Sequence, residues 1–543
     1  MTKQTLEETI DLMLFSATQN IQMFMTFLEF CNKTNGEHLT DFLQQLLQKA
    51  SQLCTSYSEP SQKPHYEHAI DMLEEMHHIC RSATHRMINT SPNVDDALKK
   101  RMSIYAEIVL NACNPHNYPF LNKAVIEKTY DTQGNNLRQG FENIIADLQK
   151  GSIQITDTSA FSVGQNLAVT PGKVIYRNDL IELIQYSPTT DTVYTTPLLI
   201  IPPWINKYYI LDLEQQNSFV RWAVDHNLTV FMISWRNPHK QQEYVGIENY
   251  IFEGIHSALL QIAEQCQQKK INVLGYCMGG TLLAMYMAMR NNKQYQAESC
   301  EPIINKATFL TTLLNFEKAG DVGLFIHEMI HNQLESYAQK YGYINGKILF
   351  HAFSTLKSRD MIWNASVKRY MLTQPLPKNS LLFWNQDPMN ISRAMITFLT
   401  KNLYHDNLLY KGQISIRNIP IHLEDIHKHQ MYVIAMINDH LVPWKNTYEN
   451  LKLFGPNAQF VLGGAGHTAG VINPPHQQKY CYWTHNDFSI SSEQWLQQAK
   501  KISGSWWEHW LDWIQEPSTV VSRPILNGLY DAPGQYVMQN IYM

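Results

Sequence analysis

The stretch Ile271-Asn-Val-Leu-Gly-Tyr-Cys-Met-Gly-Gly280 decides the fold of this chain. Its first four residues form a short, largely apolar run that predicts a buried strand, and residues 281–289 predict a helix directly after it. Cys277 then lies at a sharp, strained turn, and glycines on both sides avoid collisions there. The start of the following helix favours thiolate over thiol at this sulfur. The stretch therefore predicts an exposed cysteine nucleophile.

The alternation of strand and helix continues on both sides of this stretch. Further apolar runs predict strands at residues 174–176, 183–186, 198–201, 229–233 and 306–314, and residues 249–267 predict a helix. Continuous apolar strands that alternate with amphipathic helices indicate a parallel sheet covered on both faces. The alternation stops after Phe316 and returns with strands at 431–435 and 459–462. We therefore expect a cap or lid insertion over about residues 317–425.

A candidate acid and a candidate base follow Cys277 in the chain, each directly after an expected strand. Asp439 comes after the expected strand at 431–435, and His467 comes after the expected strand at 459–462. Nucleophile, acid and histidine in this order are typical of the α/β-hydrolase fold. A turn residue at Asp439 and a loop histidine at 467 are the alternatives for each residue alone. The joint placement of all three predicts a catalytic triad of Cys277, Asp439 and His467.

Two backbone groups are candidates for an oxyanion hole. The first donor should be the N–H of Met278, directly after the nucleophile, and the second should come from the loop after the strand at 198–201. We assign the second donor to Ile205, with Trp204 as its competitor. Trp204 has the alternative role of a core aromatic residue.

The N-terminal part follows a different pattern. Residues 4–113 have helical periodicity, and all 12 tryptophans lie at or after Trp204. We predict a helical accessory domain over residues 1–160 and a catalytic domain over residues 161–543. His77, His78 and His85 lie in the helical part without acidic or cysteine partners at ligand spacing, so we interpret them as solvated helix residues and expect no metal.

Composition narrows the class of protein. The 43 basic and 48 acidic residues give a net charge of −5, which gives no support to nucleic acid as a partner. No apolar run reaches the length of a membrane span, and the N-terminus lacks the pattern of a signal peptide, so we expect a cytoplasmic protein. The eight cysteines are scattered, with no spacing typical of zinc sites or of a disulfide framework.

Several long motifs together resemble the class I polyhydroxyalkanoate synthases. They lie at residues 202–213, 234–238, 275–280, 381–385, 439–444, 466–475 and 504–507. The match runs from about residue 140 to the end of the chain. The box at 275–280 is also similar to that of the two-subunit synthases. Their catalytic chains are much shorter, so the length of 543 residues favours the single-subunit class.

The resemblance implies polymerisation of (R)-3-hydroxyacyl-CoA, with 3-hydroxybutyryl-CoA as the expected monomer, and release of CoA. Cys277 would carry the acyl group as a thioester, and His467 would act as its general base. Asp439 would orient His467, activate the 3-hydroxyl of the incoming group, or do both. CoA is part of the substrate, and no cofactor is implied. The implied partners are the growing polyester, the granule surface, granule-associated proteins and a second copy of the chain.

Two other functions remain open from the sequence. The first is an acyl-CoA thioesterase or esterase, because the same residues with water as the acceptor would hydrolyse the thioester. The second is a non-catalytic granule-binding protein, against which the intact Cys277, Asp439 and His467 argue. The N-terminal helices would either bind a granule or partner, or pack within the protein.

Overall fold

A computed structural model describes most of the chain and divides it into two compact units. It describes residues 65–150, 152–296, 301–326, 328–515 and 520–539, with single residues between 26 and 55. The expected helices before residue 65 thus lie outside the continuously described ranges. Unit 1 comprises Met1–Thr158 and Ile348–Asn379, and unit 2 comprises Ser159–Lys347 and Ser380–Met543.

Unit 2 is built on a mixed sheet of eleven described strands in the order β15-β14-β13-β12-β7-β6-β4-β5-β2-β1-β17. The six strands from β13 to β5 are parallel to one another, and the flanking strands pair antiparallel. The strands are β1 (Gly172–Arg177), β2 (Ile181–Tyr186), β4 (Leu198–Ile201), β5 (Val230–Trp235), β6 (Lys270–Tyr276), β7 (Ile303–Leu310), β12 (Gln430–Met436), β13 (Ala458–Gly463), β14 (Cys481–Thr484), β15 (Lys500–Ser503) and β17 (Tyr530–Asp531).

The sheet is mixed, whereas the apolar runs by themselves predict a parallel sheet. Antiparallel partners flank the parallel strands because short connections, such as the one between β1 and β2, return the chain beside itself. The strand expected over 306–314 ends earlier, at Leu310, because Thr311 takes a positive φ of 42°. Such a backbone cannot continue a strand.

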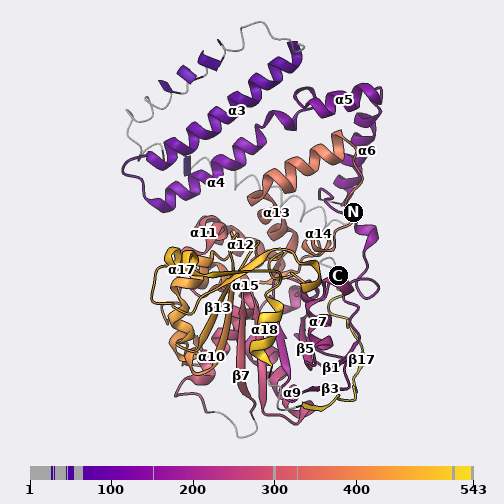
Figure 1. Cartoon of the computed structure of the whole chain (residues 1–543), viewed down its shortest axis with the longest axis vertical. Helices are drawn as coiled ribbons and strands as arrows, with labels where there is room; N and C mark the ends of the chain where they lie inside the picture. The colour runs from indigo at the N-terminus through magenta and orange to yellow at the C-terminus, as the bar shows by residue number, and fades with distance from the viewer. Residues whose placement is uncertain are drawn as a thin grey trace. The chain divides into compact units, whose positions relative to one another are not determined.

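Helices cover the sheet of unit 2, as Figure 1 shows. Helices α7 (Phe219–Asp225) and α18 (Trp507–Ile514) share one apolar core with alternate strand residues, among them Leu274 and Tyr276. Helices α9 (Ser257–Cys266) and α10 (Met278–Asn291) also contact β6, but their buried side chains lie outside that core. This is the arrangement expected when successive strand residues point to opposite faces.

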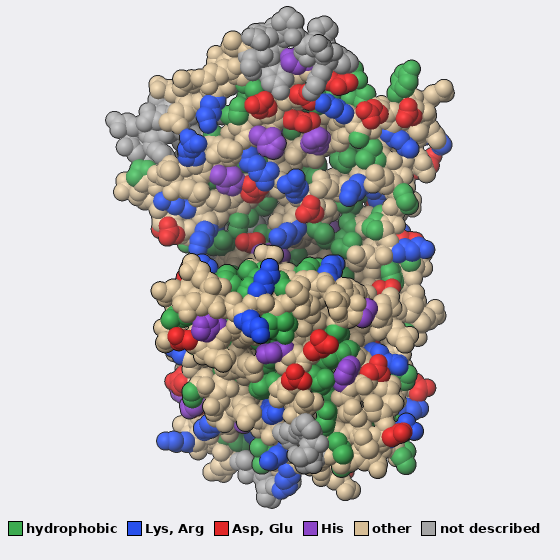
Figure 2. Space-filling view, in the orientation of Figure 1, with side chains coloured by type: hydrophobic (Ala, Val, Ile, Leu, Met, Phe, Trp, Pro, Cys, Tyr) green, Lys and Arg blue, Asp and Glu red, His purple; other side chains and the backbone are tan. Residues whose placement is uncertain are grey.

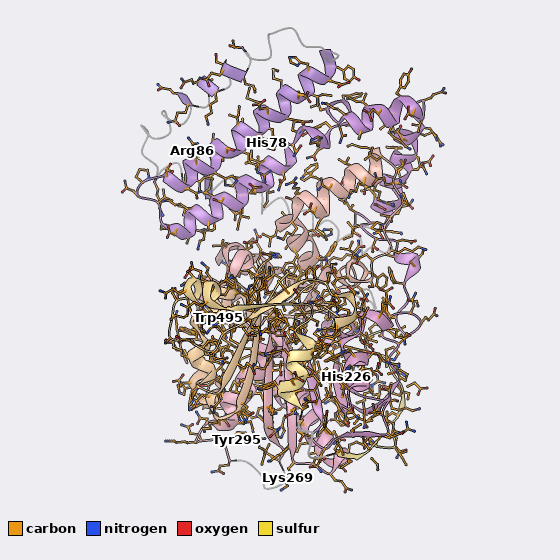
Figure 3. All side chains as sticks on the ribbon, viewed as in Figure 1. His78, Arg86, His226, Lys269, Tyr295 and Trp495 are labelled. Carbon is orange, nitrogen blue, oxygen red and sulfur yellow. The ribbon has the colours of Figure 1, made fainter. Side chains whose placement is uncertain are left out.

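The carboxyl ends of the parallel strands define one edge of the sheet. Lys269, labelled in Figure 3, precedes β6 and thus marks the opposite, amino edge. Cys277, Thr311 and the residues after β12 and β13 all follow strand ends at the carboxyl edge. In open α/β sheets, ligands bind at this edge.

The residues of the expected insertion are shared between the two units. Unit 2 contains α11 (Gly320–Phe325), α12 (Glu328–Tyr341), α14 (Ser380–Asn385), α15 (Arg393–Thr397) and η11 (Phe398–His405). Residues 348–379, which include most of α13 (Gly346–Leu356), η9 (Arg359–Asn364) and η10 (Val367–Met371), fold into unit 1.

Unit 1 is helical in its described part. Its N-terminal elements are α3 (His65–Thr90), α4 (Asp96–Ala112), α5 (Lys123–Asp131) and α6 (Asn135–Lys150). His77 Nε2 lies 2.8 Å from the carbonyl oxygen of Leu110, and Arg81 and His85 both contact the carboxylate of Glu107. Two of the three histidines thus join α3 to α4, rather than being simply solvated.

Residues 348–379 make several polar contacts with α6. Arg369 donates two hydrogen bonds of 2.7 Å to the Asp147 carboxylate, and the Tyr370 hydroxyl donates a third of 2.8 Å. Asn136 Nδ2 donates to the carbonyl oxygen of Met371 at 2.7 Å. These contacts join two stretches of chain more than 200 residues apart, a pairing that local periodicity does not reveal.

The surface carries charges of both signs. Figure 2 shows Lys and Arg side chains interspersed with Asp and Glu on the visible face of each unit. Among the described helices, none is long and apolar enough to cross a membrane.

Candidate active site

Cys277 lies between β6 and α10, at the carboxyl edge of the sheet. Its φ of 53° and ψ of −122° form the strained turn that the sequence predicts. A Cβ on Gly275 would lie 2.5 Å from the Gly280 Cα, and a Cβ on Gly280 would lie 1.9 Å from Thr312 Oγ1. Real Cβ atoms do not approach other atoms so closely, so both glycines are required for the turn to pack. The Cys277 thiol itself is partly exposed.

The start of α10 lies against the end of β4. A Cβ on Gly279 would lie 2.2 Å from the carbonyl oxygen of Ile201 and 2.6 Å from that of Pro202. The N–H of Met278 and the loop that begins at Pro202 therefore share one corner of the site. This is the corner where the two expected oxyanion donors, Met278 and Ile205, have to meet.

His467 and Asp439 are joined directly. His467 Nδ1 lies 2.6 Å from Asp439 Oδ2, and the other carboxylate oxygen accepts hydrogen bonds of 2.9 Å from the N–H groups of Leu441 and Val442. The Asp439 side chain is 0% exposed and that of His467 is 8% exposed. The loops after β12 and β13 thus bring together two of the three expected catalytic residues, with both oxygens of the acid occupied.

The surroundings of His467 favour its protonated form. Burial by itself lowers the pKa of His467, but the Asp439 carboxylate and Cys277 outweigh it and hold this pKa well above its ordinary value. Within the described site, Cys277 and His467 interact electrostatically and share no hydrogen bond, so His467 has to approach the sulfur to exchange a proton with it.

Two tryptophans hold the loop that carries His467. The indole N–H of Trp506 donates to the carbonyl oxygen of Gly470, and that of Trp507 donates to the carbonyl oxygen of Val471, each at 2.9 Å. The spacing of these tryptophans indicates only a core or interface helix face. The spacing does not reveal that these residues hold the loop. The chemistry of the side chain could have indicated it, because a buried indole N–H needs a hydrogen-bond acceptor.

The segment that contains α14 contacts the loop expected to carry the second oxyanion donor. Trp384 Nε1 donates to the carbonyl oxygen of Lys207 at 2.8 Å. Lys207 Nζ lies 2.8 Å from Asp387 Oδ1, and the Tyr209 hydroxyl donates to the other oxygen of Asp387 at 2.9 Å. The sequence motifs at 202–213 and 381–385 therefore form one contact. Because the two motifs are far apart in the chain, the sequence alone does not predict this contact.

Trp204 has the side-chain position of a core residue. It is 2% exposed, and its ring centroid lies 5.8 Å from that of Tyr250. The assignment of the second donor to Ile205 or to Trp204 stays a prediction, as does that of Met278. Within the described ranges, no group of three histidine, cysteine or carboxylate side chains is arranged to hold a metal ion.

Comparisons with known proteins match both parts of the chain. The family model "alpha/beta hydrolase fold" matches residues 202–474, and the model "Poly-beta-hydroxybutyrate polymerase (PhaC) N-terminus" matches residues 59–223. The first match confirms the fold predicted from the order of Cys277, Asp439 and His467.

Individual relatives agree with these models. A poly(3-hydroxyalkanoate) polymerase subunit from Rhizobium meliloti is 37% identical over 86% of this chain and 77% of its own length. A poly(3-hydroxyalkanoate) polymerase from Methylorubrum extorquens is 36% identical over 86% of this chain and 78% of its own. The corresponding subunit from Cupriavidus necator is 35% identical over 82% and 76%. The chain therefore belongs to the poly(3-hydroxyalkanoate) polymerase family of acyltransferases, with the resemblance to class I borne out.

Proposed function

We propose that this protein polymerises (R)-3-hydroxyacyl-CoA into polyester and releases CoA, with Cys277 as the covalent carrier of the acyl group. The main observation that supports this proposal is the cysteine at the elbow together with the buried pair of His467 and Asp439. In this pair, Nδ1 of His467 lies 2.6 Å from Oδ2 of Asp439. The description of the matched N-terminal family model favours 3-hydroxybutyryl-CoA as the monomer.

The first step loads the enzyme. The Cys277 thiolate attacks the thioester carbonyl, and the N–H groups of Met278 and Ile205 stabilise the resulting oxyanion. The tetrahedral intermediate collapses, the carbon–sulfur bond to CoA breaks, and His467 gives its proton to the departing CoA thiolate. A cysteine suits this exchange because one thioester replaces another, which keeps the acyl group available for the next transfer.

The second step extends the chain. The 3-hydroxyl of an incoming monomer or of the chain end attacks the acyl-Cys277 carbonyl, and neutral His467 takes the hydroxyl proton. The new carbon–oxygen bond makes the ester, while the carbon–sulfur bond breaks and returns Cys277 as a thiolate beside imidazolium. Water in place of this hydroxyl would make free acid, so the site has to admit a hydroxyl while it limits water.

Asp439 acts through His467 in this proposal. Its two carboxylate oxygens are occupied by the imidazole and by two backbone N–H groups, and its side chain is 0% exposed. A substrate hydroxyl would have to displace one of these partners to reach it. The contacts therefore favour the orienting role over direct activation of the 3-hydroxyl.

Family membership supports proposals about the remaining partners. We propose that the growing polyester and the granule surface bind this protein in the cytoplasm, together with granule-associated proteins, and that two copies form a dimer. We also propose that unit 2 elements within residues 317–425 form a lid over the acyl site. Sedimentation of the protein with and without a substrate analogue measures the dimer, and proteolysis under the same conditions measures movement of the lid.

One experiment tests the reaction. The wild-type protein is incubated with (R)-3-hydroxybutyryl-CoA, and in parallel with a longer 3-hydroxyacyl-CoA, while free CoA, free hydroxy acid and insoluble polymer are all measured. We expect CoA release matched by polymer, and faster release from the shorter substrate. CoA release matched by free hydroxy acid would contradict the proposal and identify a thioesterase instead.

A further inference from the structure

The residue that precedes the nucleophile faces the catalytic histidine. Tyr276 is the last residue of β6 and is 1% exposed. Its ring stacks on the imidazole of His467 with 5.7 Å between centroids and 27° between planes. This contact covers one face of the ring, whereas Asp439 holds its Nδ1 atom.

The phenol of Tyr276 contacts the same loop a second time. The phenol interacts electrostatically with the side chain of Thr468, the residue after His467. Tyr276 therefore touches two consecutive residues of the loop whose backbone Trp506 and Trp507 hold further along. Together these contacts leave the imidazole little freedom to tilt.

The chemistry of Tyr276 excludes a role as acid or base. Burial, with a smaller contribution from Cys277, raises the pKa of the Tyr276 phenol to about 12, so it stays neutral while the enzyme works. A neutral, buried ring can orient its neighbour without exchanging protons. Such a residue acts through His467 rather than on the substrate.

We propose that Tyr276 is a positioning residue that sets the plane of the His467 imidazole for proton exchange with Cys277 and with the attacking hydroxyl. The second of these exchanges rests on the function proposed above, whereas the first depends only on the elbow and the histidine. The position matters because Cys277 and His467 share no hydrogen bond in the described site, so the orientation of the imidazole affects its proton exchange with the sulfur.

Three variants of Tyr276 separate its two contacts. Tyr276→Phe keeps the ring and loses the hydroxyl, whereas Tyr276→Leu and Tyr276→Met lose the ring. We expect a loss in kcat for CoA release of less than about 5-fold for the first and between about 10- and 100-fold for the other two, with KM little changed, because small misplacements of a catalytic group have effects of this size. The pH dependence of Cys277 alkylation by iodoacetamide should change in the same order.

Tyr432→Leu is the matched control. Tyr432 is also a buried strand tyrosine whose hydroxyl meets a histidine, since it lies 3.0 Å from His509 Nδ1. We expect this variant to lower the melting temperature and to leave kcat and the alkylation profile unchanged. Thermal unfolding of every variant identifies any that does not fold, and Tyr276→Phe and Tyr276→Met keep the test open if Tyr276→Leu fails.

The outcomes are distinct. A wild-type kcat and alkylation profile in a folded Tyr276→Leu or Tyr276→Met variant would overturn the proposal. An equal effect of Tyr432→Leu would also overturn it, because loss of packing would then explain both. If the wild-type protein makes no polymer but the alkylation profile still depends on Tyr276, the proposed polymerisation fails and the positioning role stands.

Discussion

The two units of this protein are stabilised in different ways. Unit 2 is built around strands of buried and largely apolar residues, and β2, β4 and β5 contain no exposed side chain. In unit 1, polar contacts join the two stretches of chain, among them those between Asp147 and Arg369. The apolar cluster among the described residues of unit 1, which includes Ile88 and Leu98, is much smaller than the core of unit 2. From this difference we expect catalysis to depend on the sheet of unit 2. We expect the stability of unit 1 to change on single polar substitutions.

The distribution of tryptophans allows the unfolding of unit 2 to be measured by fluorescence. Trp363 lies within residues 348–379 and so belongs to unit 1, while every other tryptophan lies in unit 2. Fluorescence of a Trp363→Phe variant therefore follows the unfolding of unit 2 by itself. Hydrogen exchange of α3 to α6 follows unit 1.

The largest expected effect is on chemistry at the elbow. Cys277→Ala should lower CoA release by at least about a thousand-fold, because loss of a nucleophile removes the covalent step. The melting temperature should stay close to that of the wild-type protein. CoA release measured with a thiol reagent checks the first expectation, and calorimetry checks the second.

Cys266→Ala is the control for this substitution. Burial raises the pKa of the Cys266 thiol, on α9, to about 12, which makes it an unreactive packing residue. We expect its removal to leave CoA release within about 2-fold of the wild-type rate, as for other substitutions away from the site. Loss of activity in this variant, with activity retained in Cys277→Ala, would reverse the assignment of the nucleophile.

The next effect is on unit 1. Asp147→Ala leaves the Arg369 guanidinium, which is 13% exposed, without its carboxylate. Breaking one side of a buried ion pair costs about 3–5 kcal/mol. We expect faster hydrogen exchange in α6 and in residues 348–379, with unchanged exchange in β4 to β7. Faster exchange throughout the sheet would show that the two units do not unfold separately.

This pair also predicts a pH dependence. Burial opposes ionisation of Asp147, but hydrogen bonds from Arg369 and Gln154 hold the pKa of this carboxyl below its usual value. The stabilisation is thus present above the unfolded pKa of about 3.9 and is lost as pH falls through the lower folded value. Exchange rates of α6 measured between pH 3 and 6 should show this loss in the wild-type protein and not in Asp147→Ala.

At the active site, we expect a smaller pH dependence of stability, opposite in direction to that of Asp147. The pKa of His467 is raised in the folded state, so its stabilising contribution is complete below the unfolded value of about 6.5 and is lost as pH rises through the folded value. The difference in unfolding free energy between wild type and His467→Gln should therefore shrink as pH rises from 6. Urea unfolding followed by tryptophan fluorescence in the Trp363→Phe background measures it. A constant difference across pH would contradict the protonated histidine.

The smallest effect is expected from an exposed pair on α6. Arg138 and Glu142 form an ion pair one turn apart, with side chains 69% and 58% exposed. Such pairs contribute only about 0.3–0.5 kcal/mol, so Arg138→Ala should hardly change the exchange of α6. Because Asp147 lies on the same helix, the two substitutions compare buried and exposed charge directly. Equal effects would show that burial of Asp147 is not what stabilises unit 1.

The sequence predicts the catalytic sheet more fully than the N-terminal unit. Buried parallel strands are continuous apolar runs, and the elbow needs glycines at set positions, so both are visible locally in residues 271–280. The polar contacts that join Asp147 to Arg369 leave no periodic pattern. The helical and aromatic character of residues 348–379 therefore predicts only that they belong to one insertion. It does not predict that they fold into unit 1.

The sequence by itself determined the α/β-hydrolase fold, the elbow at Cys277 and the order in which Asp439 and His467 follow it, because strand runs, turn glycines and chain order are local properties. Only the tertiary structure decided which distant segments meet. It joins residues 348–379 to α6, brings Trp384 and Asp387 to the loop at Lys207, and stacks Tyr276 on His467. These contacts depend on side chains that find partners far along the chain, and no spacing in the sequence specifies such partners.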